Sequence, residues 1–83
     1  LFVSQGGQVM EKIFAWFKVN YPDYELMYAC DSINGSHIFY IRKLAPGALM
    51  FKEIISAADI RNSTSPDEFV MNTLKELIES MEE

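Results

Sequence analysis

The sequence predicts an α+β fold with the element order α-β-β-β-α, in which a three-stranded antiparallel sheet carries both helices on one face. Three observations predict it. Apolar residues recur at helical spacing near both ends of the chain, β-forming residues fill the middle, and turn signals separate them. With 83 residues the chain supports a single core, and its 49% apolar content is that of a folded protein.

The first helix is predicted over residues 9–21, where the apolar side chains fall within one arc at 100° per residue. Pro22 ends it, because the proline ring disfavours helical geometry at the preceding residue. Residues before this pattern show no periodicity and include two consecutive glycines. We therefore expect residues 1–9 to be a flexible N-terminal segment or an expression remnant, and residues 10–83 to form a single α+β domain.

The first two strands are predicted over residues 24–30 and 37–43, joined by a type I′ turn at Asn34-Gly35. One face then pairs Cys30 with Phe39, Tyr28 with Ile41 and Leu26 with Lys43. The other face pairs Asp31 with Ile38, Ala29 with Tyr40 and Met27 with Arg42.

A third strand is predicted over residues 49–55, after a turn at Ala45-Pro46-Gly47. A three-residue loop places Ile41 opposite Phe51, and a two-residue loop places Ile41 opposite Lys52. The first register fits better, because it keeps an apolar residue on the core face.

The last helix is predicted to follow a polar connector, residues 56–64, that holds a short helical turn. It begins with a capping box, in which the Ser65 hydroxyl accepts from the Glu68 N–H and the Glu68 carboxylate reaches back. Pro66 suits the first helical position. The expected core comprises Ile13, Phe14, Phe17, Leu26, Tyr28, Phe39, Ile41, Phe51, Val70, Leu74 and Leu77.

The formal net charge of −5 is concentrated at the end of the chain. Residues 1–62 carry six basic and six acidic side chains, so residues 63–83, with six acidic side chains and one lysine, supply the whole surplus. Because nucleic-acid affinity depends on Lys and Arg at phosphates, this balance disfavours nucleic acid. It favours a protein partner with a basic surface.

Catalytic and metal-binding patterns are weak. Cys30 and His37 are the one nucleophile and base that the register brings near each other, about 7 Å apart as diagonal neighbours. A buried cysteine acting as a small apolar residue explains Cys30 better. Asp31, His37 and Asp59 are scattered. We expect no enzyme, no cofactor, no metal, no membrane association, and a cytoplasmic location.

The α-β-β-β-α order resembles the double-stranded RNA-binding domain, which implies duplex RNA as an alternative partner for Arg42, Lys43, Lys52 and Arg61. That family begins its second helix with a lysine cluster that grips phosphates. Here the corresponding residues are Ser65-Pro66-Asp67-Glu68, so acid replaces base.

The outer face of the predicted sheet is the more informative surface, because it carries Tyr, Met and Arg, which are enriched at protein interfaces. We predict a small non-enzymatic protein-interaction module, with a homo-oligomeric structural domain as a further alternative. The candidate binding residues are Met27, Tyr40, Arg42, Met50 and Lys52 on the sheet, and Glu76, Glu79, Glu82 and Glu83 on the last helix.

In size, segregated acidic charge and element order, the chain is similar to small inhibitors encoded by phages and mobile elements, including some anti-CRISPR proteins. The similarity implies a host protein as target. No motif is shared, so it assigns no role to a particular residue.

Overall fold

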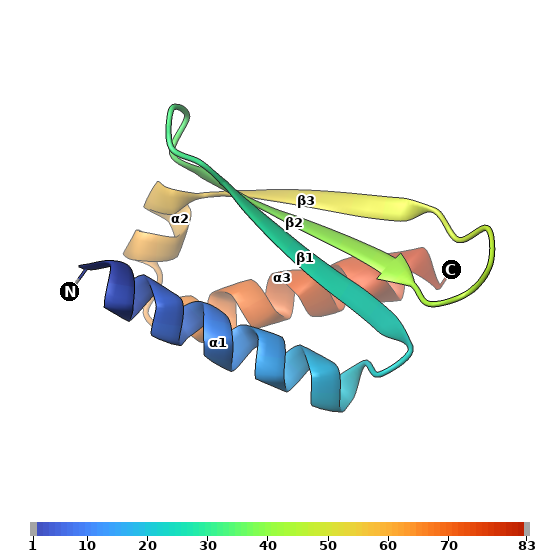
Figure 1. The fold of residues 1–83 in the computed structure, drawn as a ribbon. Coiled ribbons are helices and arrows are strands. Elements are labelled where there is room, and N and C mark those ends of the chain that lie inside the picture. Colours follow the sequence, from blue (N-terminus) through green and yellow to red (C-terminus); the bar gives the residue numbers. More distant parts are fainter. Residues whose placement is uncertain (1, 83) are drawn as a thin grey trace.

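The computed structural model describes the backbone of residues 2–82 and the side chains of residues 9–82. It has one open three-stranded sheet with helices on one side (Figure 1). The elements are α1 (Phe2–Asn20), β1 (Tyr24–Asp31), β2 (Ser36–Lys43), β3 (Met50–Ser56), α2 (Ala57–Asn62) and α3 (Pro66–Met81). The predicted fold class is confirmed, with the short helix α2 in the predicted connector.

Helix α1 begins at Phe2, earlier than the apolar periodicity predicted. The two glycines at positions 6 and 7 hid this extension, because each disfavours a helix by about 1 kcal/mol relative to alanine. The side chains of residues 1–8 lie outside the described residues. Whether residues 1–9 form a flexible segment stays a prediction.

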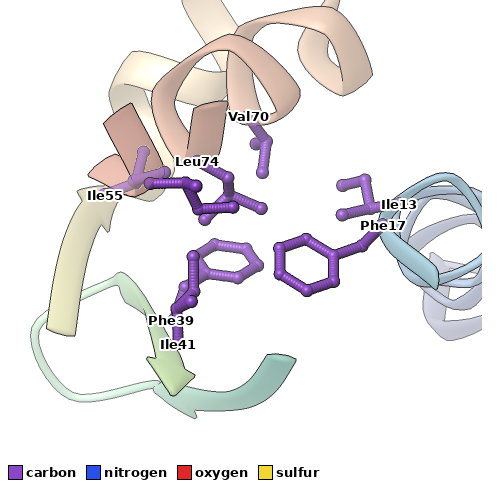
Figure 2. Close-up of a cluster of buried hydrophobic side chains, with 8 residues drawn as sticks. Ile13, Phe17, Phe39, Ile41, Ile55, Val70 and Leu74 are labelled. Atoms are coloured by element: carbon purple, nitrogen blue, oxygen red, sulfur yellow. The ribbon is translucent and has the colours of Figure 1, made fainter. Parts of the chain in front are cut away.

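The core lies between the sheet and helices α1 and α3. Its buried side chains are Ile13, Phe17, Phe39, Ile41, Ile55, Val70, Leu74 and Ile78. Figure 2 shows side chains from both helices and from strands β2 and β3 converging on one another.

Two predicted core residues are wrong, because Phe14 and Phe51 are 36% and 38% exposed. Phe14 lies at the margin of the buried arc of α1, and Phe51 lies in an edge strand, where neighbours cover one side only. The prediction missed Ile55 and Ile78, both of which are buried.

The hairpin between β1 and β2 differs from the predicted type I′ turn. Tyr28 pairs with Phe39, two residues from the predicted Ile41, and the loop has four residues, 32–35. In the described residues only glycines have positive φ, so Asn34 cannot occupy a type I′ position. Side chains alternate with a period of two, so this even shift leaves every residue on its predicted face.

The Asp31 carboxylate determines the longer loop. It accepts hydrogen bonds from the backbone N–H groups of Ile33 and Asn34, at 3.1 and 3.2 Å, and from the Asn34 side-chain amide at 2.8 Å. The bonds from Asn34 lower the pKa of Asp31. This Asx-type arrangement offers the chain an alternative to the two-residue turn.

The register of β3 is confirmed, with Ile41 opposite Phe51 and Arg42 opposite Met50. The connection between these strands, residues 44–49, is longer than the predicted three-residue loop. Gly47 has φ of +75°, as its place after Pro46 predicts.

The predicted capping box is wrong, because the Ser65 side chain makes no capping hydrogen bond. The Ser65 hydroxyl donates instead to Asp67 Oδ1 at 2.8 Å, and Lys12 Nζ lies 2.6 Å from Asp67 Oδ2. The hydrogen bonds from Lys12 and then Ser65 lower the pKa of Asp67 to about 2. Asp67 thus ties the start of α3 to helix α1.

We expect Asp67 to stabilise the folded chain at neutral pH and to lose this contribution at acidic pH. Its pKa is about 2 in the folded chain against the ordinary 3.8, so the unfolded chain takes up this proton first as the pH falls. The contribution is present above about pH 4 and is lost as the pH falls toward 2. We expect the urea midpoint of the wild type to fall more steeply from pH 5 to pH 2.5 than that of Asp67→Asn. Asp59→Asn, at an exposed carboxylate of α2, is the control, and equal slopes for all three proteins would contradict this role.

Candidate interaction surface

The face of the sheet opposite the helices is called the outer face. Strand pairing aligns Met27, Tyr40 and Lys52 in one row across the three strands, and Ala29, Ile38 and Ile54 in the next. A third row holds Glu25, Arg42 and Met50. The structure therefore brings together all five predicted sheet residues: Met27, Tyr40, Arg42, Met50 and Lys52.

The described helices all lie on the other side of the sheet, so none covers this face (Figure 1). Met50 and Ile54 are 48% and 54% exposed, and Tyr40 is partly buried between its neighbours on β1 and β3. Half-buried apolar side chains beside an aromatic ring are typical of surfaces that can bury further apolar area against a binding partner.

Arg42 is held within its own sheet. Its Nη2 lies 2.6 Å from Glu25 Oε1 on the neighbouring strand, and both side chains are partly exposed. The Arg42 Nε atom is buried and makes no hydrogen bond with any described residue. The pair lowers the net positive charge of the outer face and presents a planar guanidinium beside Met50.

Of the candidate acidic residues, Glu76 and Glu79 lie on α3, and Glu82 is the residue that follows the helix at its C-terminal end. Val70, Leu74 and Ile78 form the buried side of α3, which leaves Glu76 and Glu79 exposed. Glu83 lies outside the described residues.

Glu82 has a structural contact that the sequence did not suggest. The Tyr24 hydroxyl donates to Glu82 Oε2 at 2.6 Å, which links the end of the chain to the start of β1. This hydrogen bond raises the pKa of Tyr24 to about 12. Burial, with added repulsion from Glu79 and Glu82, raises the pKa of Tyr21.

The two candidate surfaces lie on opposite sides of the molecule. Helix α3 packs beneath the sheet, whereas the outer face is the upper surface in Figure 1. A single flat partner cannot contact Tyr40 and Glu79 together. The predicted set of binding residues is therefore two separate surfaces.

A groove of about 570 Å³ opens at the end of the sheet where β3 begins, and sequence reasoning did not identify it. It combines exposed Leu49 and Phe51 with Met81, and with the polar side chains of Lys43, Tyr24 and Glu82. No local pattern indicates it, because its walls come from β1, the end of β2 and its connection to β3, β3 itself and the end of α3.

Cys30 and His37 face each other directly across the hairpin, closer than the predicted diagonal. Cys30 is exposed, which corrects the expectation of a buried cysteine. His37 Nδ1 is hydrogen-bonded to the Tyr28 hydroxyl, and the two rings are stacked with centroids 5.7 Å apart. Burial, with the neighbouring Cys30, raises the pKa of Tyr28 to about 12. One imidazole nitrogen is therefore occupied by Tyr28.

The four basic residues considered for RNA do not form one surface. Arg42 and Lys52 lie on the outer face, Lys43 alternates to the other side at the end of β2, and Arg61 lies in α2. The start of α3, where the RNA-binding family carries lysines, holds Asp67 and Glu68.

Within residues 2–82, no helix is long and apolar enough to cross a membrane. The described side chains include no cluster of three His, Cys, Asp or Glu residues that could hold a metal ion. Comparison of the chain with protein-family models, curated proteins and solved structures finds no match.

Proposed function

We propose that this chain is a small non-enzymatic module that binds another protein through the outer face of its sheet. The observation that supports the proposal is a sheet face that no described helix covers and that carries exposed apolar side chains around Tyr40. An antiparallel sheet can leave one face in water, but that face then normally carries polar residues. Here Met27, Ile38, Met50 and Ile54 lie among the polar residues of that face.

The residue types fit a binding surface with a few dominant contacts. Full burial of a Met or Ile side chain contributes about 1.5–3 kcal/mol, so covering the exposed half of Met50 and Ile54 contributes about half of that for each. Tyr and Arg are the types most often found at energetically dominant positions. Tyr40 and Arg42 lie two residues apart on the central strand, both facing outward.

A partner contact at the acidic side of α3 is a separate proposal for the same class of function. Glu76 and Glu79 are exposed and would attract a basic surface. Such a contact is screened by salt, whereas an apolar contact on the outer face is not. Inhibition of a host protein, the role of the small phage-encoded proteins that this chain resembles in size and charge, would require one of these two surfaces.

The test compares proteins retained from the source cells by the immobilised wild type with those retained by two double variants. Tyr40→Ala with Met50→Ala should lose the bound partner, because it removes the apolar contacts of the outer face. Glu76→Lys with Glu79→Lys should retain it, and the binding should survive about 0.5 M salt. The two variants change equal numbers of residues on opposite sides and serve as controls for each other.

Retention of the same partner by the sheet variant would contradict the outer-face proposal. Loss with the helix variant alone, together with loss at high salt, would assign binding to α3. A partner that binds through nucleic acid would disappear after nuclease treatment, which would favour the RNA alternative.

A further inference from the structure

The edge of β3 differs from the other edge of the sheet. The strand order is β1-β2-β3, so within the backbone of residues 2–82 both β1 and β3 have one unpaired side. Every strand residue that is large, apolar and exposed belongs to β3, namely Met50, Phe51 and Ile54. Strand β1 has none and carries two carboxylates, Glu25 and Asp31, which discourage pairing at an edge.

The direction of the free backbone groups of β3 follows from one hydrogen bond at the end of the ladder. The Ala57 N–H donates to the Gly35 carbonyl at 2.7 Å, in the same register as the β2–β3 pairing. Hydrogen-bonded pairs alternate in an antiparallel ladder, so residues 51, 53 and 55 bond to β2. Lys52 and Ile54 therefore direct their N–H and C=O groups away from the sheet.

We propose that this edge pairs antiparallel with β3 of a second copy of the chain, around a two-fold axis at Ile54. The two sheets then form one continuous six-stranded sheet. A two-fold axis perpendicular to the sheet keeps both outer faces on the same side. This pairing uses the backbone edge of the sheet, and it shares Lys52 and Ile54 with the outer face for which the function is proposed.

Charge decides among the possible registers. An axis at Lys52 places two lysines directly opposite each other, and an axis at Glu53 does the same with two carboxylates, about 4.5 Å apart at Cα. An axis at Phe51 or Ile55 pairs only three strand residues from each chain. The axis at Ile54 pairs residues 52–56 without opposing like charges.

The same register suits a second copy of the chain. It places the two exposed Ile54 side chains opposite each other, Lys52 opposite Ser56, and Glu53 opposite Ile55. In this register β3 pairs with itself through an apolar contact at the axis and without charge repulsion. One pair of strands buries less area than a standard interface, so we expect a weak dimer in the micromolar range.

The first test is mass as a function of concentration, by sedimentation equilibrium from about 10 μM to about 1 mM. The wild type should rise from 9.5 kDa toward twice that mass. Ile54→Lys should stay monomeric, because two ammonium groups would then oppose each other. Ile33→Lys is the matched control, since Ile33 is 93% exposed in the hairpin loop, and it should dimerise like the wild type.

A second variant tests the backbone contact itself. Lys52→Pro removes an N–H that faces the free edge and leaves the bonds between β2 and β3 intact. It should keep the circular dichroism spectrum of the wild type and lose the dimer. A wild type that remains at 9.5 kDa at the highest concentration, or a dimer that survives both Ile54→Lys and Lys52→Pro, would overturn the proposal.

Cysteine cross-linking tests the register. Single cysteines are placed at position 52, 53 or 54 in a Cys30→Ser background. Each lies directly opposite the same cysteine of the second copy only when the two-fold axis is at that position. Oxidation should cross-link the variant at position 54 fastest. Fastest cross-linking at position 52 or 53 would overturn the axis at Ile54.

Discussion

Replacing Ile41 with aspartate should unfold the domain, whereas the same replacement at Ile54 should leave it folded. Ile41 is fully buried on the helix side of the central strand, and Ile54 lies on the outer face of the next strand. An unpaired buried carboxylate costs about 3–5 kcal/mol, and the lost apolar burial adds about 1.5–3 kcal/mol. A chain of this length has a total stability of only about 4–12 kcal/mol.

The measurement is far-ultraviolet circular dichroism with urea denaturation, at a protein concentration low enough to keep the chain monomeric. Ile54→Asp should retain a cooperative transition near that of the wild type. Unfolding of both variants would mean that the outer face is also buried and would remove the basis for the proposed function. A folded Ile41→Asp protein would contradict the position of the core.

Phe39→Ala should be the most destabilising truncation, with a loss of about 3–5 kcal/mol in the free energy of unfolding. Phe39 is buried at the centre of the sheet, and its ring packs against Tyr28 with centroids 5.2 Å apart. Helices α1 and α3 cover it with other core side chains, so the lost ring leaves a cavity (Figure 2).

Phe14→Ala is the matched control, because it removes the same ring from a side chain at the margin of helix α1. Its cost should be below about 1.5 kcal/mol, since surface positions away from special features contribute little. The two urea midpoints at neutral pH give the comparison. Equal losses in the free energy of unfolding would show that the ring of Phe14 is packed more fully than its exposure indicates.

The sequence predicted which side of the sheet each strand residue occupies, because that information is carried by the alternation of apolar and polar residues. Tyr40 and Met27 are on the outer face, as predicted, even though their pairing was assigned two residues out of register. An odd error would have exchanged the two faces. The face on which a strand residue lies is thus easier to predict than the residue with which it pairs on the neighbouring strand.

Side-chain hydrogen bonds were not predictable in the same way. Asp31 and Asp67 each replace an expected local motif, the type I′ turn and the capping box. Asp31 accepts from backbone N–H groups in the turn, and Asp67 accepts from the Ser65 hydroxyl, which the capping box would have used as an acceptor. The position of the Asp67 carboxylate is determined by its ion pair with Lys12, which is distant in sequence.

For the sheet part of the candidate site, both the residues and their common face were predicted, whereas its position relative to α3 was not. The residues of the outer face come together because they share three adjacent strands. Their separation from Glu76 and Glu79, and the use of Glu82 by Tyr24, depend on how α3 packs under the sheet. That packing is a tertiary property, which helical periodicity alone does not specify.

The one-sided core has a consequence for how such a chain can evolve. Mutations at Met27, Tyr40 or Ile54 remove few contacts that hold the fold together, because the covering layer lies on the other side. Mutations at Ile41 or Phe39 are far more costly. Selection can therefore change the side chains of the outer face while folding stability stays nearly constant. The stable half of the molecule becomes a scaffold, and the other half is free to diversify.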